Sequence, residues 1–385
     1  MVLLRFDFRD IFKSNRLAFS LQRMWIQFIG IATGYLGYLV LTYLSIIIAG
    51  QKFSEVWHQM GIFPCLAGFD AAWYSWLIFI IGALFLLAVY LVTAAAVSRA
   101  AYMLLKGNNF YTWKEAFCFA FRKSSAVLFS PLAIAILIGL FLIGAAVVGL
   151  LAKIPYVGEL GFSLLYFIWL MAGLLIVFFV IALITSLILS PAIIATTDDD
   201  AFEAVFQSFA TFWNQPWRLI AYQALTGALS VVGFLVLAFL VKKAFLLTDS
   251  IFTYIVGDKY INLMGQGMYI ITGWIAVSIS WMQSLLGESI DLFYFSRDFL
   301  QLQLPTVINI ASYIFAVMWL FIGGWIVSYG LSTFNVGNTL IYLVLRKIKD
   351  DENLLEREDM EEMEDEELEE EKTGNETDSI EDENK

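Results

Sequence analysis

Few side chains in this sequence could carry acid–base, nucleophilic or metal chemistry. The 385 residues include a single histidine, His58, and two cysteines, Cys65 and Cys118. A zinc site usually needs about three or four histidine, cysteine or carboxylate ligands at recognisable spacing, and the sequence has no such group. It also has no phosphate-binding glycine loop and no hydrolase nucleophile motif. We therefore expect no catalytic residue, no metal site, no cofactor and no enzyme activity.

One pair of carboxylates could still form a polar site. Glu288 and Asp291 follow an apolar stretch and lie three residues apart, so they would share a helix face. A cation or a substrate headgroup could bind there, which would suit a membrane enzyme with an interfacial site. A solvated connector that leads into the next apolar segment is the interpretation that we favour.

The composition indicates a membrane protein. Hydrophobic residues make up 60% of the chain and charged residues 15%, against about 45–50% and 25% in soluble proteins. The net charge of −12 is unevenly distributed, because residues 346–385 contain 20 acidic and 6 basic side chains. This segment has a net charge of −14 and the rest of the chain +2. The sequence is thus a weakly basic apolar body with an acidic tail.

Seven stretches without charged residues are long enough to cross a bilayer, which takes about 20 apolar residues. They are 24–51, 71–98, 124–152, 160–197, 219–241, 260–287 and 299–345. Basic residues cluster before the first stretch and between the second and the third, which favours a cytoplasmic position for both segments. The sixth stretch is the least apolar, because it is rich in Asn, Gln, Ser and Thr.

These features predict an all-α, polytopic transmembrane bundle of about six spans in the cell inner membrane. Arg346, Lys347 and Lys349 favour a cytoplasmic C-terminus, which requires an even number of spans because the N-terminus is also cytoplasmic. We therefore assign 260–287 to an outer or re-entrant helix. The predicted spans lie near 24–50, 72–98, 128–152, 162–190, 219–241 and 306–330. The alternative has seven or eight spans, with 262–286 and 331–345 as further crossings.

Three amphipathic segments, here called elbow helices, precede spans at 1–23, 112–125 and 200–214. In the third, six apolar residues fall within one arc of about 120°; they are Phe202, Val205, Phe206, Phe209, Phe212 and Trp213. Thr112 with Glu115 and Asp200 with Glu203 have the spacing of a helix-starting capping box.

Two groups of elbow residues are predicted to contact lipid. Basic and aromatic amphipathic helices lie in the membrane interface, where anionic headgroups attract them. The predicted contacts are Arg5, Arg9, Lys13 and Arg16 in the first elbow and Phe202, Phe206, Phe209 and Trp213 in the third. The alternative, which is the more common use of such helices, is that they only brace the bundle.

These openings carry a family resemblance. Glu115-Ala116-Phe117 and Glu203-Ala204-Val205, each followed by an apolar hairpin, together with Asn338–Leu343 before a charged tail, resemble a group of bacterial six-span membrane proteins. The group includes the membrane domain attached to some glycerophosphodiester phosphodiesterases. The resemblance covers roughly residues 5–348 and implies an inner-membrane helical bundle. The chain has no phosphodiesterase catalytic domain, so that activity is not implied.

The predicted spans contain no ionisable residue. Such residues usually mark ion paths or proton relays, so their absence counts against ion-coupled transport. Polar residues in the spans, such as Gln27, Gln223 and Ser230, are expected to bond across helices. Three small-residue motifs, Gly30-x-x-x-Gly34, Ala135-x-x-x-Gly139 and Ala145-x-x-x-Gly149, predict close helix packing.

The acidic tail, 346–385, is expected to be disordered and cytoplasmic, because it has little apolar content and many like charges. Three interpretations are open: a solvated tail without a partner, a docking segment at 350–371 for a basic cytoplasmic protein, and weak pairing with the chain's own basic elbows.

Three function classes follow. The first is a non-enzymatic membrane scaffold or accessory protein whose elbows contact lipid and whose tail contacts a basic partner or the elbows. The second is a transporter or channel for an uncharged or amphiphilic, lipid-like solute. The third is the interfacial enzyme described above. Membrane lipids are expected partners and nucleic acid is not.

Overall fold

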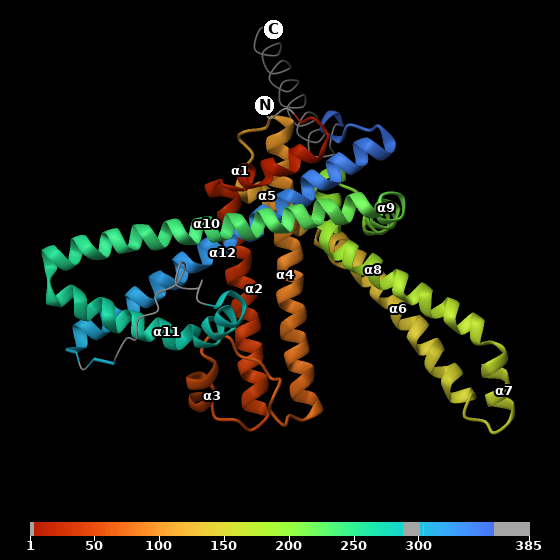
Figure 1. The fold of residues 1–385 in the computed structure, drawn as a ribbon, viewed down its shortest axis with the longest axis horizontal. Coiled ribbons are helices and arrows are strands. Elements are labelled where there is room, and N and C mark those ends of the chain that lie inside the picture. Colours follow the sequence, from red (N-terminus) through yellow and green to blue (C-terminus); the bar gives the residue numbers. More distant parts are fainter. Residues whose placement is uncertain (1–3, 288–300, 303, 358–385) are drawn as a thin grey trace, which may run out of the picture. The chain divides into compact units, whose positions relative to one another are not determined.

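The computed structural model describes all residues except 1–3, 288–300, 303 and 358–385, and its described regular elements are helices (Figure 1). The helices are η1 (Phe8–Phe12), α1 (Lys13–Ala18), α2 (Leu21–Ile48), α3 (Phe53–Met60), α4 (Trp73–Lys106), α5 (Trp113–Arg122), α6 (Ser124–Leu151), α7 (Val157–Leu164), α8 (Tyr166–Thr197), α9 (Ala201–Asn214), α10 (Pro216–Val256), α11 (Asp258–Leu286), α12 (Thr306–Asp350) and η3 (Leu354–Glu356).

The chain forms two compact units. Unit 1 comprises 1–11, 98–223 and 337–385, and unit 2 comprises 12–97 and 224–336. Helices α4, α10 and α12 therefore contribute to both units. Each unit is described by itself below.

The helical, membrane-type fold is as predicted. Seven described helices are long and apolar enough to cross a membrane: α2, α4, α6, α8, α10, α11 and α12. Six of them have mean hydropathies from 1.8 to 3.0, whereas that of α11 is 1.2. The number of candidate spans is thus one more than the six predicted, because the demoted segment 260–287 forms one continuous helix of sufficient length.

Several helices extend past the predicted spans. α4 continues to Lys106, so Arg99 lies on a helix and not in a loop. α10 has 41 residues and α12 has 45, which at 1.5 Å per residue gives lengths of about 60–70 Å. The hydrocarbon core of a bilayer is about 30 Å thick, so each helix is roughly twice as long as a perpendicular crossing requires.

Unit 1 contains a projecting hairpin and a buried region. The hairpin, here called the arm (132–184), consists of most of α6, α7 and most of α8, which run side by side with α7 at their tip (Figure 1). In the most apolar windows of α6 and α8 only 6% of the residues are buried. A side chain at Gly139 or Gly149 would meet nothing within 4 Å. These two small-residue motifs therefore do not mediate packing within the described chain.

Most of the rest of unit 1, here called the head (98–131, 185–223 and 337–350), contains the buried region. The last turns of α8, from Leu189 to Thr197, and residues 338–345 of α12 are buried on all sides. A helix that is apolar all round can be stable only when protein or lipid covers every face.

In unit 2, α2 and α4 approach closely at the first small-residue motif. A Cβ at Gly30 would lie 2.1 Å from the Thr93 hydroxyl oxygen, and one at Gly34 would lie 3.2 Å from a methyl group of Leu86. Only glycine fits this approach at position 30 without a shift of the neighbouring helix. The prediction of close packing is confirmed for this motif.

Polar residues of the spans bond across helices, as predicted. Asn335 donates to Gln27 (2.8 Å) in unit 2, and Gln223 donates to Asn338 (2.9 Å) in unit 1. The Ser230 hydroxyl donates to the Gly330 carbonyl (2.6 Å). Threonines such as Thr185 instead bond the carbonyl of their own preceding turn. Each bond removes an unsatisfied polar group from an apolar environment.

Candidate membrane interface and tail anchor

The third elbow forms helix α9, and its ends follow from the sequence. The Asp200 side chain accepts a hydrogen bond from the Glu203 amide (2.9 Å), so it caps the N-terminus. The preceding helix α8 ends at Thr197, and the capping residue Asp198 has a left-handed backbone (φ 58°). The two acidic residues thus terminate one helix and start the next within a few residues.

Helix α9 is inside-out compared with a helix of a soluble protein. Its polar residues Gln207, Ser208 and Thr211 are buried. Its aromatic residues face outward, with exposed fractions of 78% for Phe202, 58% for Phe206 and 71% for Trp213. In a soluble protein the apolar face of such a helix covers the core. The reversed arrangement suits a helix whose outer face contacts lipid.

The fourth predicted contact, Phe209, has a different position. Its ring packs against those of Phe178 (5.8 Å between centroids) and Phe179 (6.1 Å) of α8, and it is only half-exposed. Phe209 therefore fastens α9 to the arm, as the bracing interpretation predicts for this residue.

A polar network holds the inner face of α9. Arg346 of α12 donates to the side-chain oxygen of Gln207 (2.5 Å), and the side-chain amide of Gln207 donates to the Glu203 carboxylate. The Arg346 guanidinium also forms ion pairs with Asp350 and Glu352, each at 2.9 Å. The orientation of α9 is thus fixed from both sides, by aromatic packing and by charge-assisted hydrogen bonds.

The second elbow forms helix α5, which begins with the predicted capping box. Thr112 accepts from the Glu115 amide, and the Glu115 side chain accepts from the Thr112 amide (2.7 Å). Phe119 is buried, whereas Trp113 and Phe121 are exposed. This helix therefore presents both aromatic and charged residues on its outer side.

Arg99 connects α4, α5 and α8 inside the head. Its guanidinium is fully buried, lies 4.3 Å from the centre of the Phe119 ring and donates to the Ala195 carbonyl (3.1 Å). Ala195 belongs to the last turn of α8, where unpaired carbonyls carry partial negative charge. A cation at this position compensates the partial negative charge of a helix end that is buried in the head.

A second cation, which is only partly buried, joins the helix ends. Lys123, the residue after α5, forms an ion pair with Asp198 (2.7 Å) and donates to the Asp198 carbonyl (2.6 Å). Asp198 is buried. The pair fixes the C-terminus of α8 to the C-terminus of α5.

The described chain continues beyond the predicted start of the tail at 346. Helix α12 extends to Asp350, and a short strap (351–357) follows and docks on the head. Leu354 is buried, Tyr102 donates to the Leu354 carbonyl (2.7 Å), and Lys106 donates to the Arg357 carbonyl (2.7 Å). The tail was predicted to start at 346 because the average composition of 346–385 is acidic. That average does not reveal that one leucine, Leu354, is buried. Residues 358–371 of the predicted docking segment lie outside the described residues.

The strap also places a charge next to the α8–α9 corner. Arg357 lies 3.7 Å from the Asp199 carboxylate. Burial raises the pKa of Asp199, while Thr197 and Arg357 act in the opposite direction. The negative charge of Asp199, at the corner between α8 and α9, is therefore only partly compensated by Arg357.

The first elbow is not one helix over 1–23. It consists of η1 and α1, and the chain turns at Phe19 and Ser20 before α2 begins. The buried Asp10 accepts from the amides of Arg5 and Phe6 (2.7 Å each), which shapes the start. Arg5, Arg9 and Arg16 are exposed and Lys13 is half-buried. The predicted basic stripe is divided, because Arg5 and Arg9 belong to unit 1 and Lys13 and Arg16 to unit 2.

The predicted carboxylate site, Glu288 and Asp291, lies outside the described residues. Among the residues that the structure does describe, no three His, Cys, Asp or Glu side chains are close enough to hold a metal ion. Neither Arg99 nor Leu354 was predicted from the sequence as a site residue. The signals for them were weak: a charged residue directly after a predicted span, and a leucine within an acidic segment.

No family model, curated protein or solved structure matches this chain. The fold and the apolar helices define the class: this is a multi-pass, helical membrane protein.

Proposed function

We propose that the chain is a non-enzymatic membrane scaffold or accessory protein that holds an acidic tail at a fixed position on the cytoplasmic membrane surface. The observation that supports this most directly is the strap. Tyr102, Lys106 and Asp199 hold residues 354–357 against the head. The acidic segment after Arg357 thus starts from a defined point, which favours presentation to a basic cytoplasmic protein.

The outer faces of the elbows support the membrane part of the proposal. The exposed aromatic residues of α9 suit insertion among lipid tails, and the exposed Arg5, Arg9 and Arg16 suit anionic headgroups. We propose the inner membrane as location, with both termini in the cytoplasm and with α11 as an outer or re-entrant helix, which its low hydropathy favours.

A deletion tests the scaffold role. The full chain and a chain that ends at Arg357 are produced in native membranes, and proteins are photo-crosslinked from a probe placed at Ala201 in both. We expect a basic cytoplasmic protein to be captured by the full chain, to be lost with the tail, and to be released by salt. Equal capture by both chains, or none by either, contradicts the proposal.

A second function is favoured by an apolar cavity in unit 2. It has a volume of about 610 Å³ and lies between α2, α10 and α12, with Trp25, Phe321 and Trp325 in its wall. An acyl chain of a lipid-like solute would suit such a wall. Transport of a fluorescent lipid by proteoliposomes, equal for the full and the shortened chain, would favour the transporter over the scaffold.

A further inference from the structure

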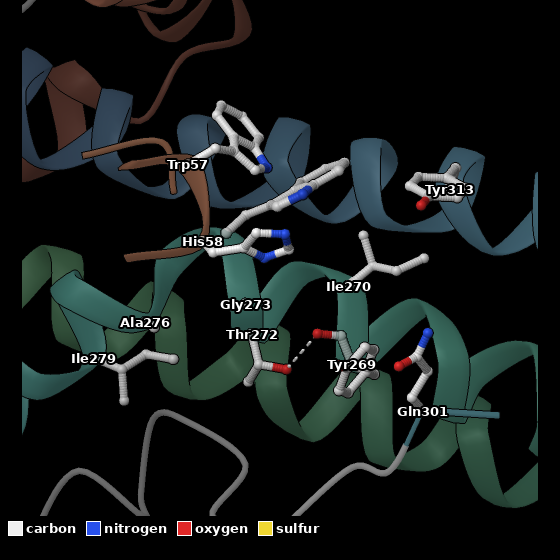
Figure 2. Close-up of a pocket in the computed structure, with 11 residues that line it drawn as sticks. Trp57, His58, Tyr269, Ile270, Thr272, Gly273, Ala276, Ile279, Gln301 and Tyr313 are labelled. Atoms are coloured by element: carbon white, nitrogen blue, oxygen red, sulfur yellow. Dashed lines mark hydrogen bonds between the residues drawn. The ribbon is translucent and has the colours of Figure 1, made fainter. Parts of the chain in front are cut away.

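A different cavity in unit 2 has the character of a ligand site. It has a volume of about 690 Å³ and lies between α3 and α11, with Tyr313 of α12 and Gln301 at one end (Figure 2). Small-molecule pockets usually have volumes of about 300–1,000 Å³. No residue of the elbow helices is among the described residues that line it.

The cavity is held open by a specific support. Three tyrosines of α2 donate to the loop after α3: Tyr35 to Ile62 (2.5 Å), Tyr38 to Pro64 (2.9 Å) and Tyr43 to Gly61. The Ile62 amide donates in turn to the Trp274 carbonyl of α11 (2.9 Å). Gly61 has φ +55°, and a Cβ there would lie 2.1 Å from that carbonyl oxygen. The wall formed by α3 is thus fixed to α11 before any ligand binds.

Aromatic rings form one part of the wall. The ring centroids of Trp57 and Trp274 are 6.5 Å apart at an angle of 69°, and Tyr313 lies 6.3 Å from Trp274. Two indoles at a steep angle form a corner with flat apolar faces. Figure 2 shows Trp57 and His58 approaching α11 from α3, above the stretch that contains Gly273.

Neutral polar groups form the other part. The His58 ring, the Gln301 amide and the hydroxyls of Tyr269 and Tyr313 line the cavity and have no hydrogen-bond partner among the described residues. None of the described lining residues is Lys, Arg, Asp or Glu. A formally charged ligand would therefore find no counter-charge among the described lining residues.

We propose that this cavity binds a pyranose ring, either of a soluble oligosaccharide or of the sugar headgroup of a membrane glycolipid. The C–H face of a sugar ring packs on an indole, and its hydroxyls bond to neutral donors and acceptors at the edge. A quaternary ammonium ion also binds aromatic corners, but it offers no donor or acceptor to the imidazole and the amide, whereas sugar hydroxyls can bond to both.

Gly273 offers a direct test of the site. It lines the cavity, and a side chain there would meet nothing within 4 Å. Gly273→Leu therefore fills the cavity without removing any contact, and replacing a helical glycine also favours the helix. Gly323→Leu on α12 is the matched control, because that position is equally open and lies outside the cavity wall. Gln301→Ala removes one polar group from an exposed position.

The protein is placed in nanodiscs without sugar-based detergent. Maltose binding is followed by saturation-transfer NMR, and retention of a glucosyl diacylglycerol by native mass spectrometry. We expect saturable binding of at least one probe, with a Kd of about 1 mM for maltose if the soluble sugar is the ligand. Gly273→Leu is expected to weaken binding by at least about tenfold and Gln301→Ala by about three- to tenfold, with Gly323→Leu unchanged.

The two probes distinguish the sources: maltose alone indicates a soluble glycan, and the glycolipid alone indicates a membrane headgroup. Binding of neither probe, binding that Gly273→Leu leaves intact, or binding of choline in place of both overturns the proposal. These outcomes are independent of the tail, since the chain that ends at Arg357 retains the cavity.

Discussion

The arm and the head of unit 1 share helices α6 and α8, but their residues are in opposite surroundings. Along α8, the arm half exposes Leu170, Leu174 and Val177, whereas Leu189, Ile193 and Ile194 of the head half are fully buried. In the head, cations and helix ends satisfy one another, as Arg99 and Lys123 do. In the arm, the visible side-chain hydrogen bonds are local, such as that from Ser163 to Glu159.

The difference indicates whether protein or lipid surrounds each region. The head resembles the interior of a soluble protein, where burial and paired polar groups supply the stability. The arm has too few protein contacts to be covered by the described chain, so we expect lipid to cover it. Substitutions should therefore have large effects in the head and small effects on the arm, and the following predictions test this contrast.

The largest effect is expected for Arg99→Ala. The change leaves a cavity beside Phe119 and unpaired carbonyls at the end of α8, and we expect the free energy of unfolding to fall by about 4 kcal/mol. Thermal unfolding in nanodiscs, monitored by retained monomer on size exclusion, measures it. Arg122→Ala, an exposed arginine of the same head, is the control. A loss as small as that of Arg122→Ala would show that the buried Arg99 side chain does not stabilise the head.

A matched pair of leucines compares the two regions directly. Leu189 is fully buried in the head, and Leu140 on the arm is 61% exposed. Leu189→Ala should lower the free energy of unfolding by about 3 kcal/mol and Leu140→Ala by less than about 1 kcal/mol. The same unfolding assay applies. Equal losses would mean that protein contacts cover the arm after all.

Loss of the buried ion pair should be somewhat milder. Lys123→Met leaves Asp198 buried without its partner, and about 2 kcal/mol of stability should be lost, since Lys123 itself is partly exposed to solvent. Adding Asp198→Asn should recover part of this loss, because the uncompensated charge is then removed. Additive losses in the double variant would contradict a direct pair.

The smallest effect concerns the corner carboxylate. Because burial raises the pKa of Asp199 above its usual 3.8, the folded protein binds more protons than the unfolded chain just above that pH. The contribution of Asp199 to stability therefore falls as pH rises through this window. Asp199→Asn should be relatively more stabilising at neutral pH than near pH 4 in unfolding experiments. The reverse trend would mean that the Arg357 ion pair outweighs burial.

Much of the fold followed from pattern. Charge-free windows located the long helices, and the Thr112–Glu115 spacing located the start of α5. The arc of aromatic residues in α9 gave its two faces, but periodicity alone does not say which face protein covers. The polar face is placed inside by the hydrogen bond between Gln207 and Arg346, which lie 139 positions apart in the sequence. A contact over that distance cannot be predicted from local pattern.

The sites depended on contacts between distant segments. Arg99 was counted among the loop cations because nothing local distinguishes a buried arginine from an exposed one. His58 was singled out as a titratable residue, but its neighbours Gly273 and Gln301 come from another part of the chain. Leu354 is one of a few apolar residues in an acidic tail, and only its docking on Tyr102 reveals the strap.

The central claim is that the aromatic face of α9 lies in lipid, and spin-label accessibility tests it most directly. After replacement of the two free cysteines, Cys65 and Cys118, single labels are placed at Phe202, Phe206 or Trp213. Leu140 on the arm serves as the lipid control and Lys114 on α5 as the water control. We predict that the α9 labels collide with oxygen more than with a water-soluble nickel chelate, as the Leu140 label does. Accessibility to nickel equal to that at Lys114 would contradict the account.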